Sequence, residues 1–175
     1  MKPIECRVEI SAPPALVWRT VADIERAAER IPAIKSIEIL PGPRTGKGLR
    51  WRETRIMFGR EATEVMEIVE WRPPLSHAGG GMYVATAHNH GTAYRSEVRV
   101  EPFGSGARLT FTFEATALTF LARVMSGIMM PLMKGMVIKA LDADLAAIKA
   151  SCERDAERER ETPAPQALPC EPSAQ

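Results

Sequence analysis

Hydrophobic and polar residues alternate at the start of the chain and again through most of residues 35–116. Over residues 4–10, apolar and charged side chains take turns, which is the period-two pattern of a strand with one buried face. Residues 11–14, Ser-Ala-Pro-Pro, end this strand and supply an N-cap and early-helix prolines. Because apolar residues then follow at helical spacing, we predict two short helices within residues 14–30.

Six further strands are predicted from the same alternation, each bounded by residues that favour turns. They cover residues 36–40, 48–58, 60–71, 75–87, 91–101 and 107–116. The run Gly79-Gly80-Gly81 has neither the spacing nor the following helix of a dinucleotide-binding loop, so it predicts a bulge or a close backbone contact. With the N-terminal strand, seven strands are predicted.

A long apolar helix is predicted over residues 119–152, with a kink at Pro131. It carries five of the nine methionines of the chain, Met125, Met129, Met130, Met133 and Met136. Methionine is flexible and lines surfaces that fit more than one shape. Residues 153–161 are charged without an apolar stripe and are expected to extend this helix into solvent. Residues 162–175, rich in Pro and Ala, are expected to be disordered.

This order of elements predicts an α+β fold. Sequential strands with short turns build an antiparallel meander, and its apolar face must be covered by another element. The last helix is the element long enough to do so, and a helix on a curved sheet leaves a cavity unless large side chains fill it. We therefore predict one ligand-binding domain over residues 1–153, followed by the charged helix extension and tail of residues 154–175.

Four segments carry a resemblance to a known superfamily. They are ISAPPALVW followed by VAD (residues 10–18 and 21–23), GKGLRWRE (46–53), VEWRPP (69–74) and the helix of residues 131–149. Together they resemble the START-like, polyketide cyclase/dehydrase and lipid-transport (SRPBCC) superfamily over roughly residues 3–153. The resemblance implies a helix-grip fold: a seven-stranded antiparallel curved sheet wrapped around a long C-terminal helix, with two short helices after the first strand. It also implies an internal apolar cavity for lipids, polyketides, quinones or hormones, and only some members are enzymes.

Composition narrows the possible partners. A chain of 175 residues with a net charge of +1 fits a single domain and has no broad basic field for nucleic acid. Residues 117–138 are interrupted by Arg123, Pro131 and Lys134, so we predict no membrane span. The three cysteines are too few and too far apart for a disulfide framework, which suits a reducing compartment. We predict a cytoplasmic protein, and a homodimer stays open.

The triplet His88-Asn89-His90 is the sharpest local motif. On a strand its two histidines share one face, which Tyr94 would continue if no bulge intervenes. His77 is expected nearby on the preceding strand, and three imidazoles can bind zinc. No Asp or Glu lies at a spacing that would orient them, so acid/base work by His90 at the cavity mouth and a purely structural role stay open. We predict no metal and no cofactor.

Trp51, Glu53 and Arg55 alternate along one predicted strand. If Trp51 faces inward, Glu53 and Arg55 enter the cavity with it. Paired with Arg55, the Glu53 carboxylate stays ionised and can orient a polar ligand group; desolvated without that pair, its pKa rises toward acid/base use. The alternative is a solvated cross-strand ion pair.

Glu64 poses the same question of orientation. It has the parity of Met66 and Ile68, which favours the inner face, whereas Val65, Val69 and Trp71 favour the opposite one.

Tyr94 and Ser96 share the parity of the apolar residues Val98 and Val100, so they are predicted to face inward. A phenol in an apolar cavity needs a hydrogen-bond partner and often finds one on a ligand. Phe111 and the following inward residue, Phe113, either form ligand wall with the methionines or are plain core.

Three functions remain open from the sequence. The first is a carrier or sensor that binds a hydrophobic small molecule. Its predicted wall is Trp51, Phe111, Phe113, Met125, Met129 and Met133, and its polar anchors are Tyr94, Ser96 and Arg55. The second is a metal-free polyketide cyclase, aromatase or dehydratase in which Glu53, His90 or Tyr94 moves protons. The third is a partner-binding module whose cavity is merely core.

Overall fold

The structure is a computed structural model that describes residues 3–57, 59–89, 91–118 and 120–161, and for residues 120–133 it describes the backbone alone. Its elements, in chain order, are β1 (Ile4–Ile10), α1 (Pro14–Ala22), α2 (Ala27–Arg30), β2 (Ile34–Ile39), β3 (Arg50–Met57), β4 (Arg60–Arg72), β5 (Gly81–Asn89), β6 (Thr92–Phe103), β7 (Gly106–Ala117) and α3 (Phe120–Glu161).

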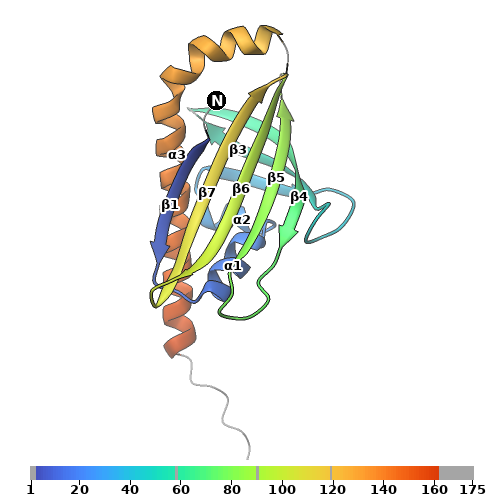
Figure 1. The fold of residues 1–175 in the computed structure, drawn as a ribbon. Helices are drawn as coiled ribbons and strands as arrows, with labels where there is room; N and C mark the ends of the chain where they lie inside the picture. The colour runs from blue at the N-terminus through green and yellow to red at the C-terminus, as the bar shows by residue number, and fades with distance from the viewer. Residues whose placement is uncertain (1–2, 58, 90, 119, 162–175) are drawn as a thin grey trace, which may run out of the picture.

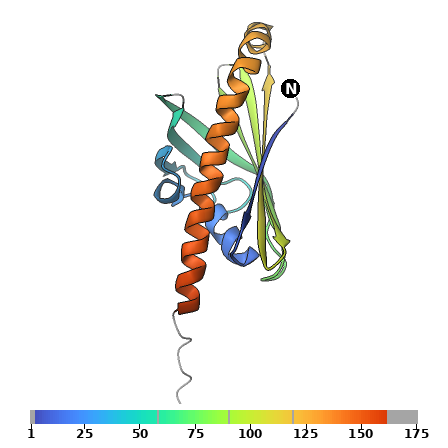
Figure 2. The same cartoon turned by 90° about the vertical axis from the view of Figure 1, so that its left-hand side faces the viewer.

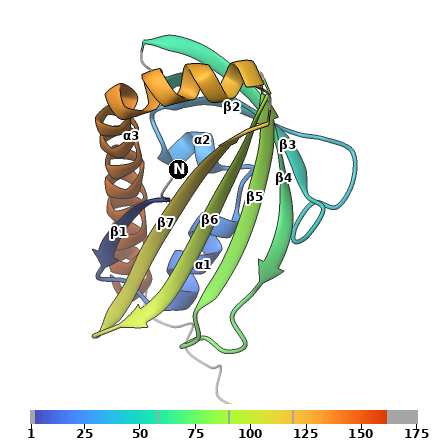
Figure 3. The same ribbon diagram turned by 45° about the horizontal axis from the view of Figure 1, so that its top comes forward.

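The seven strands form one antiparallel sheet in the order β1-β7-β6-β5-β4-β3-β2. Strands β2 to β7 are a meander, and β1 closes it by pairing with β7 over its whole length. The sheet is curved, and α3 and the short helices lie on its concave side (Figures 2 and 3). The predicted helix-grip fold, with two short helices after the first strand, is confirmed.

The helix α3 is sharply bent (Figure 1). Its first part lies across one end of the sheet, and its longer second part runs down toward α1 at the other end. The bend falls in the orange part of the ribbon, the portion of the chain that contains Pro131, where a proline kink is expected.

The charged residues 153–161 continue α3 as predicted, but they do not simply enter solvent. Ala156 is buried in the core, and Glu153 accepts a hydrogen bond from the Ser11 backbone N–H at 2.9 Å. Glu159 pairs with Arg19 of α1 at 2.6 Å. Residues 153–161 therefore contact the N-terminal part of the chain through Ser11 and Arg19. The sequence did not indicate these contacts, because this segment has no apolar stripe.

The predicted fourth strand begins later than its sequence indicates, at Gly81 instead of residue 75. The residues before Gly81 form a loop. Its backbone packs closely against the core, and glycines allow this because they have no side chain. A Cβ on Gly80 would lie 2.5 Å from the Val100 carbonyl oxygen, and one on Gly81 would lie 2.7 Å from the Trp18 ring. The close backbone contact predicted for the glycine run is confirmed.

The core is most tightly packed at the α1 end of the sheet. There the rings of Trp18 and Trp71 lie 5.0 Å apart, and Tyr83 stacks on Trp71 at 6.0 Å. The Tyr83 hydroxyl donates to the Val21 carbonyl oxygen at 3.3 Å, so this buried phenol is satisfied within the fold. Aromatic packing thus fixes the α1 end and leaves the opposite end of the concave face as the place for a site.

Two further predictions concern disulfides and a membrane span. Cys6 and Cys152 are buried free thiols, and Cys170 lies outside the described residues. Among the described residues, no helix is long and apolar enough to cross a membrane.

Candidate functional site

The predicted inward face of β3 carries a connected polar cluster. Trp51 is 3% exposed, and its indole Nε1 donates to Glu53 Oε2 at 3.3 Å. Arg55 Nη1 lies 3.6 Å from Glu53 Oε1, and Arg55 Nη2 donates to Asp144 Oδ2 at 2.5 Å. We call Trp51, Glu53, Arg55 and Asp144 the Glu53 cluster. The sequence-based alternative of a solvated cross-strand ion pair is wrong, because all three charged side chains are at most 24% exposed.

Asp144 is the functional candidate that sequence reasoning missed. It lies 89 residues from Arg55 along the chain, on α3, and a lone acidic residue in a helix normally indicates a solvated face. A signal was available, since Leu141, Asp144, Leu145 and Ile148 have the i, i+3, i+4, i+7 spacing of a core-facing stripe. Leu141 and Leu145 are buried, so this stripe places Asp144 against the sheet.

Burial raises the pKa of the Glu53 carboxyl above its usual range. The Arg55 charge and the Trp51 N–H lower that pKa, while the negative charges of Asp144 and Glu64 raise it further. The net change is upward because burial is the largest of these effects. The Glu53 carboxyl therefore takes up a proton more readily than an ordinary glutamate.

The orientation of Glu64 is settled by a bulge in β4. Glu64 pairs with Glu53 in register, so both carboxylates point to the concave face. The register shifts between Ile68 and Glu70, which turns Trp71 inward although its parity differs from that of Glu64. The parity of Met66 and Ile68 therefore gave the correct face for Glu64. Trp71 is inward because it follows the bulge, whereas Val65 precedes it and is 39% exposed.

Asn89 supports the inward position of Glu64, because its Nδ2 donates to Glu64 Oε1 at 3.3 Å. Sequence reasoning named Asn89 only as the middle of the histidine triplet. Like Asp144, it belongs to a contact between distant segments.

Tyr94, Ser96 and Phe113 come together on the concave face, as predicted. Ser96 pairs in register with Phe113, and the Tyr94 ring stacks on Phe113 at a centroid distance of 5.9 Å. Burial, and then the negative charge of Glu64, raises the pKa of the Tyr94 phenol, while a hydrogen bond with Thr92 lowers it. Tyr94 is therefore neutral at physiological pH and can donate or accept one hydrogen bond.

Burial along the concave face is graded. Leu109, Val100 and Ile68, toward the α1 end, are almost completely buried. In contrast, a set of inward apolar side chains farther along the strands keeps accessible surface. These are Met66, Tyr94, Phe111 and Phe113. The concave face is therefore less completely covered away from the α1 end.

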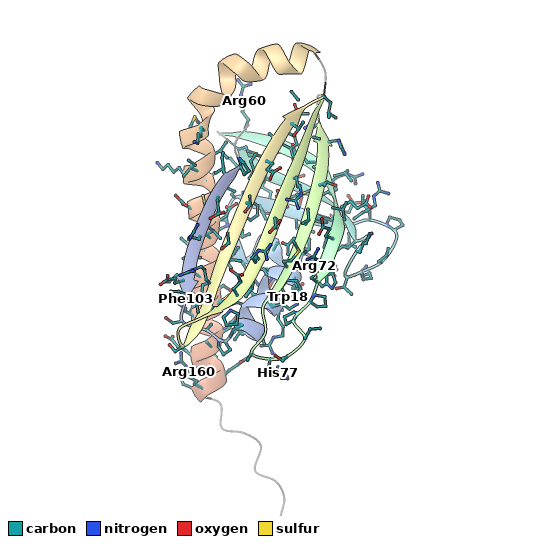
Figure 4. The ribbon with its side chains drawn as sticks, viewed as in Figure 1. Trp18, Arg60, Arg72, His77, Phe103 and Arg160 are labelled. Carbon is teal, nitrogen blue, oxygen red and sulfur yellow. The ribbon has the colours of Figure 1, made fainter. Side chains whose placement is uncertain are left out.

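The histidines do not form the expected group. His77 lies in the loop at the α1 end of the molecule (Figure 4), whereas His88 lies near the other end of β5, about 20 Å or more away at the usual rise of a strand. His88 is exposed and pairs with Ala93, so it lies on the face opposite Tyr94, because the two-residue turn after Asn89 reverses the parity. The predicted proximity of His77 and the shared face with Tyr94 are wrong. His90 lies outside the described residues.

The other predicted wall residues have mixed outcomes. Phe111 faces inward between Cys6 and Val98. The side chains of Met125, Met129 and Met133 lie outside the described part of the structure, so their place in the wall stays a prediction. In the described residues, no group of three His, Cys, Asp or Glu side chains can hold a metal ion.

Two grooves open elsewhere on the surface. One, of about 380 Å³, lies between β1 and α3; the other, of about 410 Å³, lies between α1 and the end of α3. Neither contains a predicted site residue. The first is lined by Arg7, Val8, Asp142, Leu145, Ala146, Lys149, Ala150 and Glu153.

Comparison with known proteins agrees with this architecture. The sequence model of the polyketide cyclase / dehydrase and lipid transport family matches residues 1–153. No curated protein sequence gives a significant match.

Three solved structures illustrate the shared fold. A protein of Thermus thermophilus superposes with a TM-score of 0.69 at 16% identity, covering 88% of this chain and 99% of that one. The Zhui aromatase/cyclase of Streptomyces sp. R1128 gives 0.62 at 21% identity, covering 87% and 94%. A START superfamily protein of Mycobacterium smegmatis gives 0.62 at 14% identity, covering 87% and 97%. At these identities the likeness concerns the fold alone.

Proposed function

This chain belongs to the polyketide cyclase / dehydrase and lipid transport family, and from that premise we propose that it binds a hydrophobic small molecule between the concave face of the sheet and α3. A lipid, a polyketide or a quinone has the required chemistry. The protein then acts as a carrier or sensor. A cytoplasmic location and a homodimer stay predictions of the sequence.

One observation carries the proposal: the stacked rings of Tyr94 and Phe113 face inward yet keep accessible surface, and the inward carboxylate of Glu64 is close enough to raise the pKa of the Tyr94 phenol. Apolar side chains in a closed core are normally covered completely, as Leu109 and Val100 are. An apolar wall with a few convergent polar groups is the usual composition of a small-molecule site.

The binding surface can be tested with Phe113→Ala and a lipophilic fluorescent dye. Loss of the Phe113 ring removes apolar contact, so we expect the dye to bind about tenfold more weakly or worse. The matched control is Phe103→Ala, because Phe103 is 41% exposed in the turn at the far end of the sheet (Figure 4). Dye titration by fluorescence gives both affinities.

Equal affinities of the two variants would contradict the proposed surface. Native mass spectrometry of the gently purified protein is the independent check, since a carrier is expected to retain a lipid-like mass. If no dye binds and no such mass is found, the carrier proposal fails.

A cyclase or dehydratase is the second candidate, and the raised pKa of Glu53 favours it. A carboxyl whose pKa is raised by burial holds its proton more readily than an ordinary glutamate, and in its protonated form it can protonate a leaving hydroxyl or a carbonyl oxygen. We expect Glu53→Gln to abolish turnover of a poly-β-keto substrate while dye affinity stays unchanged.

Glu67→Gln is the matched control for that experiment, because Glu67 lies on the opposite face of β4 and is half exposed. Equal loss of turnover and affinity in Glu53→Gln would assign Glu53 to positioning alone.

A further inference from the structure

Arg55 lies between two carboxylates that belong to different parts of the fold. Glu53 is two residues away on β3, at 3.6 Å, and Asp144 is on α3, at 2.5 Å. The side chains of Glu53, Arg55 and Asp144 are only 12%, 24% and 15% exposed, so each charge is largely removed from water. The Arg55 guanidinium thus contacts two largely buried carboxylates, and its shorter contact is with Asp144 on α3.

We propose that Asp144 is a positioning residue: it holds the Arg55 guanidinium on α3 and keeps it from pairing closely with Glu53. Glu53 is then free to act as a hydrogen-bond donor toward a ligand oxygen. This assignment of ligand chemistry rests on the proposed function, whereas the role of Asp144 does not.

The charges around Glu53 agree with this role. Glu64 faces it from β4, Asp144 from α3 and Arg55 from its own strand, and the Trp51 N–H contacts it directly. Tyr83 of β5 is close enough that the Glu53 charge helps to raise its pKa. Two carboxyls therefore share one guanidinium while a third, Glu64, faces them, and in a partly desolvated site such a group is stabilised when one carboxyl takes a proton.

Glu53 is the carboxyl that takes this proton. Asp144 keeps a 2.5 Å contact with the guanidinium, and Glu64 is contacted by Asn89. Glu53 has the longer contact with Arg55, and burial dominates its pKa. If α3 withdrew Asp144, Arg55 would be released to Glu53 and would favour its ionised form. The packing of α3 against β3 thereby controls the protonation of the Glu53 carboxyl.

This arrangement selects a class of ligand. A protonated carboxyl donates to a carbonyl or hydroxyl oxygen, so a neutral oxygenated apolar molecule fits the site. An anionic ligand would face two further acidic side chains, Asp144 and Glu64, and would have to displace Asp144 from Arg55. We therefore expect neutral ketones or alcohols to bind in preference to carboxylates.

The positioning role is tested by measuring the pKa of Glu53 through an NMR titration of its carboxyl carbon, assigned with Glu53→Gln. In Asp144→Asn we expect the pKa of Glu53 to fall, because a neighbouring negative charge is lost and Arg55 is released. The matched control is Asp142→Asn, which removes the same charge from an exposed position on the same helix. There the pKa of Glu53 should stay at its wild-type value.

A double-mutant cycle separates the role of Arg55 from the direct charge effect. In an Arg55→Gln background, Asp144→Asn should lower the pKa of Glu53 much less, because no guanidinium is left to release. An unchanged pKa in Asp144→Asn, an equal fall in Asp142→Asn, or a full effect without Arg55 would each overturn the proposal. Asp144→Ser gives the same comparison if Asp144→Asn does not fold.

The ligand class is tested with two probes of one skeleton, neutral 2-acetylnaphthalene and anionic 2-naphthoate. We expect the ketone to bind the wild-type protein at least tenfold more tightly, and this preference to shrink in Asp144→Asn. Equal affinities, or tighter naphthoate, would overturn the ligand class. If neither probe binds, the proposed function and the ligand class fail together, whereas the titration without ligand still decides the role of Asp144.

Discussion

Replacing Trp51 with alanine is expected to lower the free energy of unfolding by about 3–5 kcal/mol, the usual cost of truncating a buried Trp or Phe. Trp51 is almost completely buried and packs in the main core, paired in register with Ile39 and Met66. The variant also leaves Glu53 without its indole donor. Equilibrium urea unfolding followed by circular dichroism measures the loss.

Trp51→Phe keeps an aromatic ring in the core but removes the indole N–H and part of the ring system. We expect a smaller loss of about 1–3 kcal/mol, from the donor withdrawn from Glu53 together with the small cavity left by the smaller ring. If the two variants lost the same stability, the retained ring would contribute nothing, contrary to this expectation.

Replacing Arg55 with methionine is expected to lower the free energy of unfolding at pH 7 by about 1–3 kcal/mol. Breaking a fully buried ion pair costs about 3–5 kcal/mol, and the value is smaller here because the cluster keeps some contact with water. Methionine preserves the aliphatic volume, so the loss reports the uncompensated carboxylates. Arg72→Met is the matched control, since Arg72 pairs with Glu70 on the exposed surface and should change stability by about 0.5 kcal/mol or less.

This loss is expected to depend on pH. Arg55 lowers the pKa of Glu53, so removing it raises that pKa further above the unfolded value. A group with a raised folded pKa contributes its stability below the unfolded pKa, and the contribution is lost as pH rises through the folded pKa. The deficit of Arg55→Met should therefore be largest near pH 7 and should shrink toward about pH 4, where unfolded carboxyls protonate.

Urea unfolding of Arg55→Met at both pH values tests this direction, and a deficit that grew toward acid pH would refute it. Adding Glu53→Gln to Arg55→Met should recover part of the stability at pH 7, because the amide is neutral at every pH, whereas the buried carboxyl must take up a proton or remain as an unpaired charge.

Much of the fold was predictable because its periodicity is local. The alternation in β1, β6 and β7 identified strands that the structure confirms within one or two residues. The start of β5 was misplaced, because the loop before it is shaped by contacts of Gly80 and Gly81 with distant residues. The bulge in β4 was visible only as a conflict of parity, since a one-residue insertion has no sequence signature of its own.

The site was only half predictable. Parity along one strand correctly placed Trp51, Glu53 and Arg55 together, because side chains two residues apart share a face. The same rule failed for His88, since it does not extend across a turn without knowledge of the register. Asp144 and Asn89 were missed because each acquires its role from a partner on another element.

The sequence by itself determined the family, the seven strands, the long closing helix and the common face of Trp51, Glu53 and Arg55, because each follows from patterns within a short stretch of chain. Only the tertiary structure decided that Arg55 is shared between β3 and α3, with the closer contact to Asp144. Which carboxyl keeps a proton depends on distances between groups far apart in the chain and on their removal from water. Those distances are set when α3 folds onto the sheet, so the chemistry of the site follows from packing between elements.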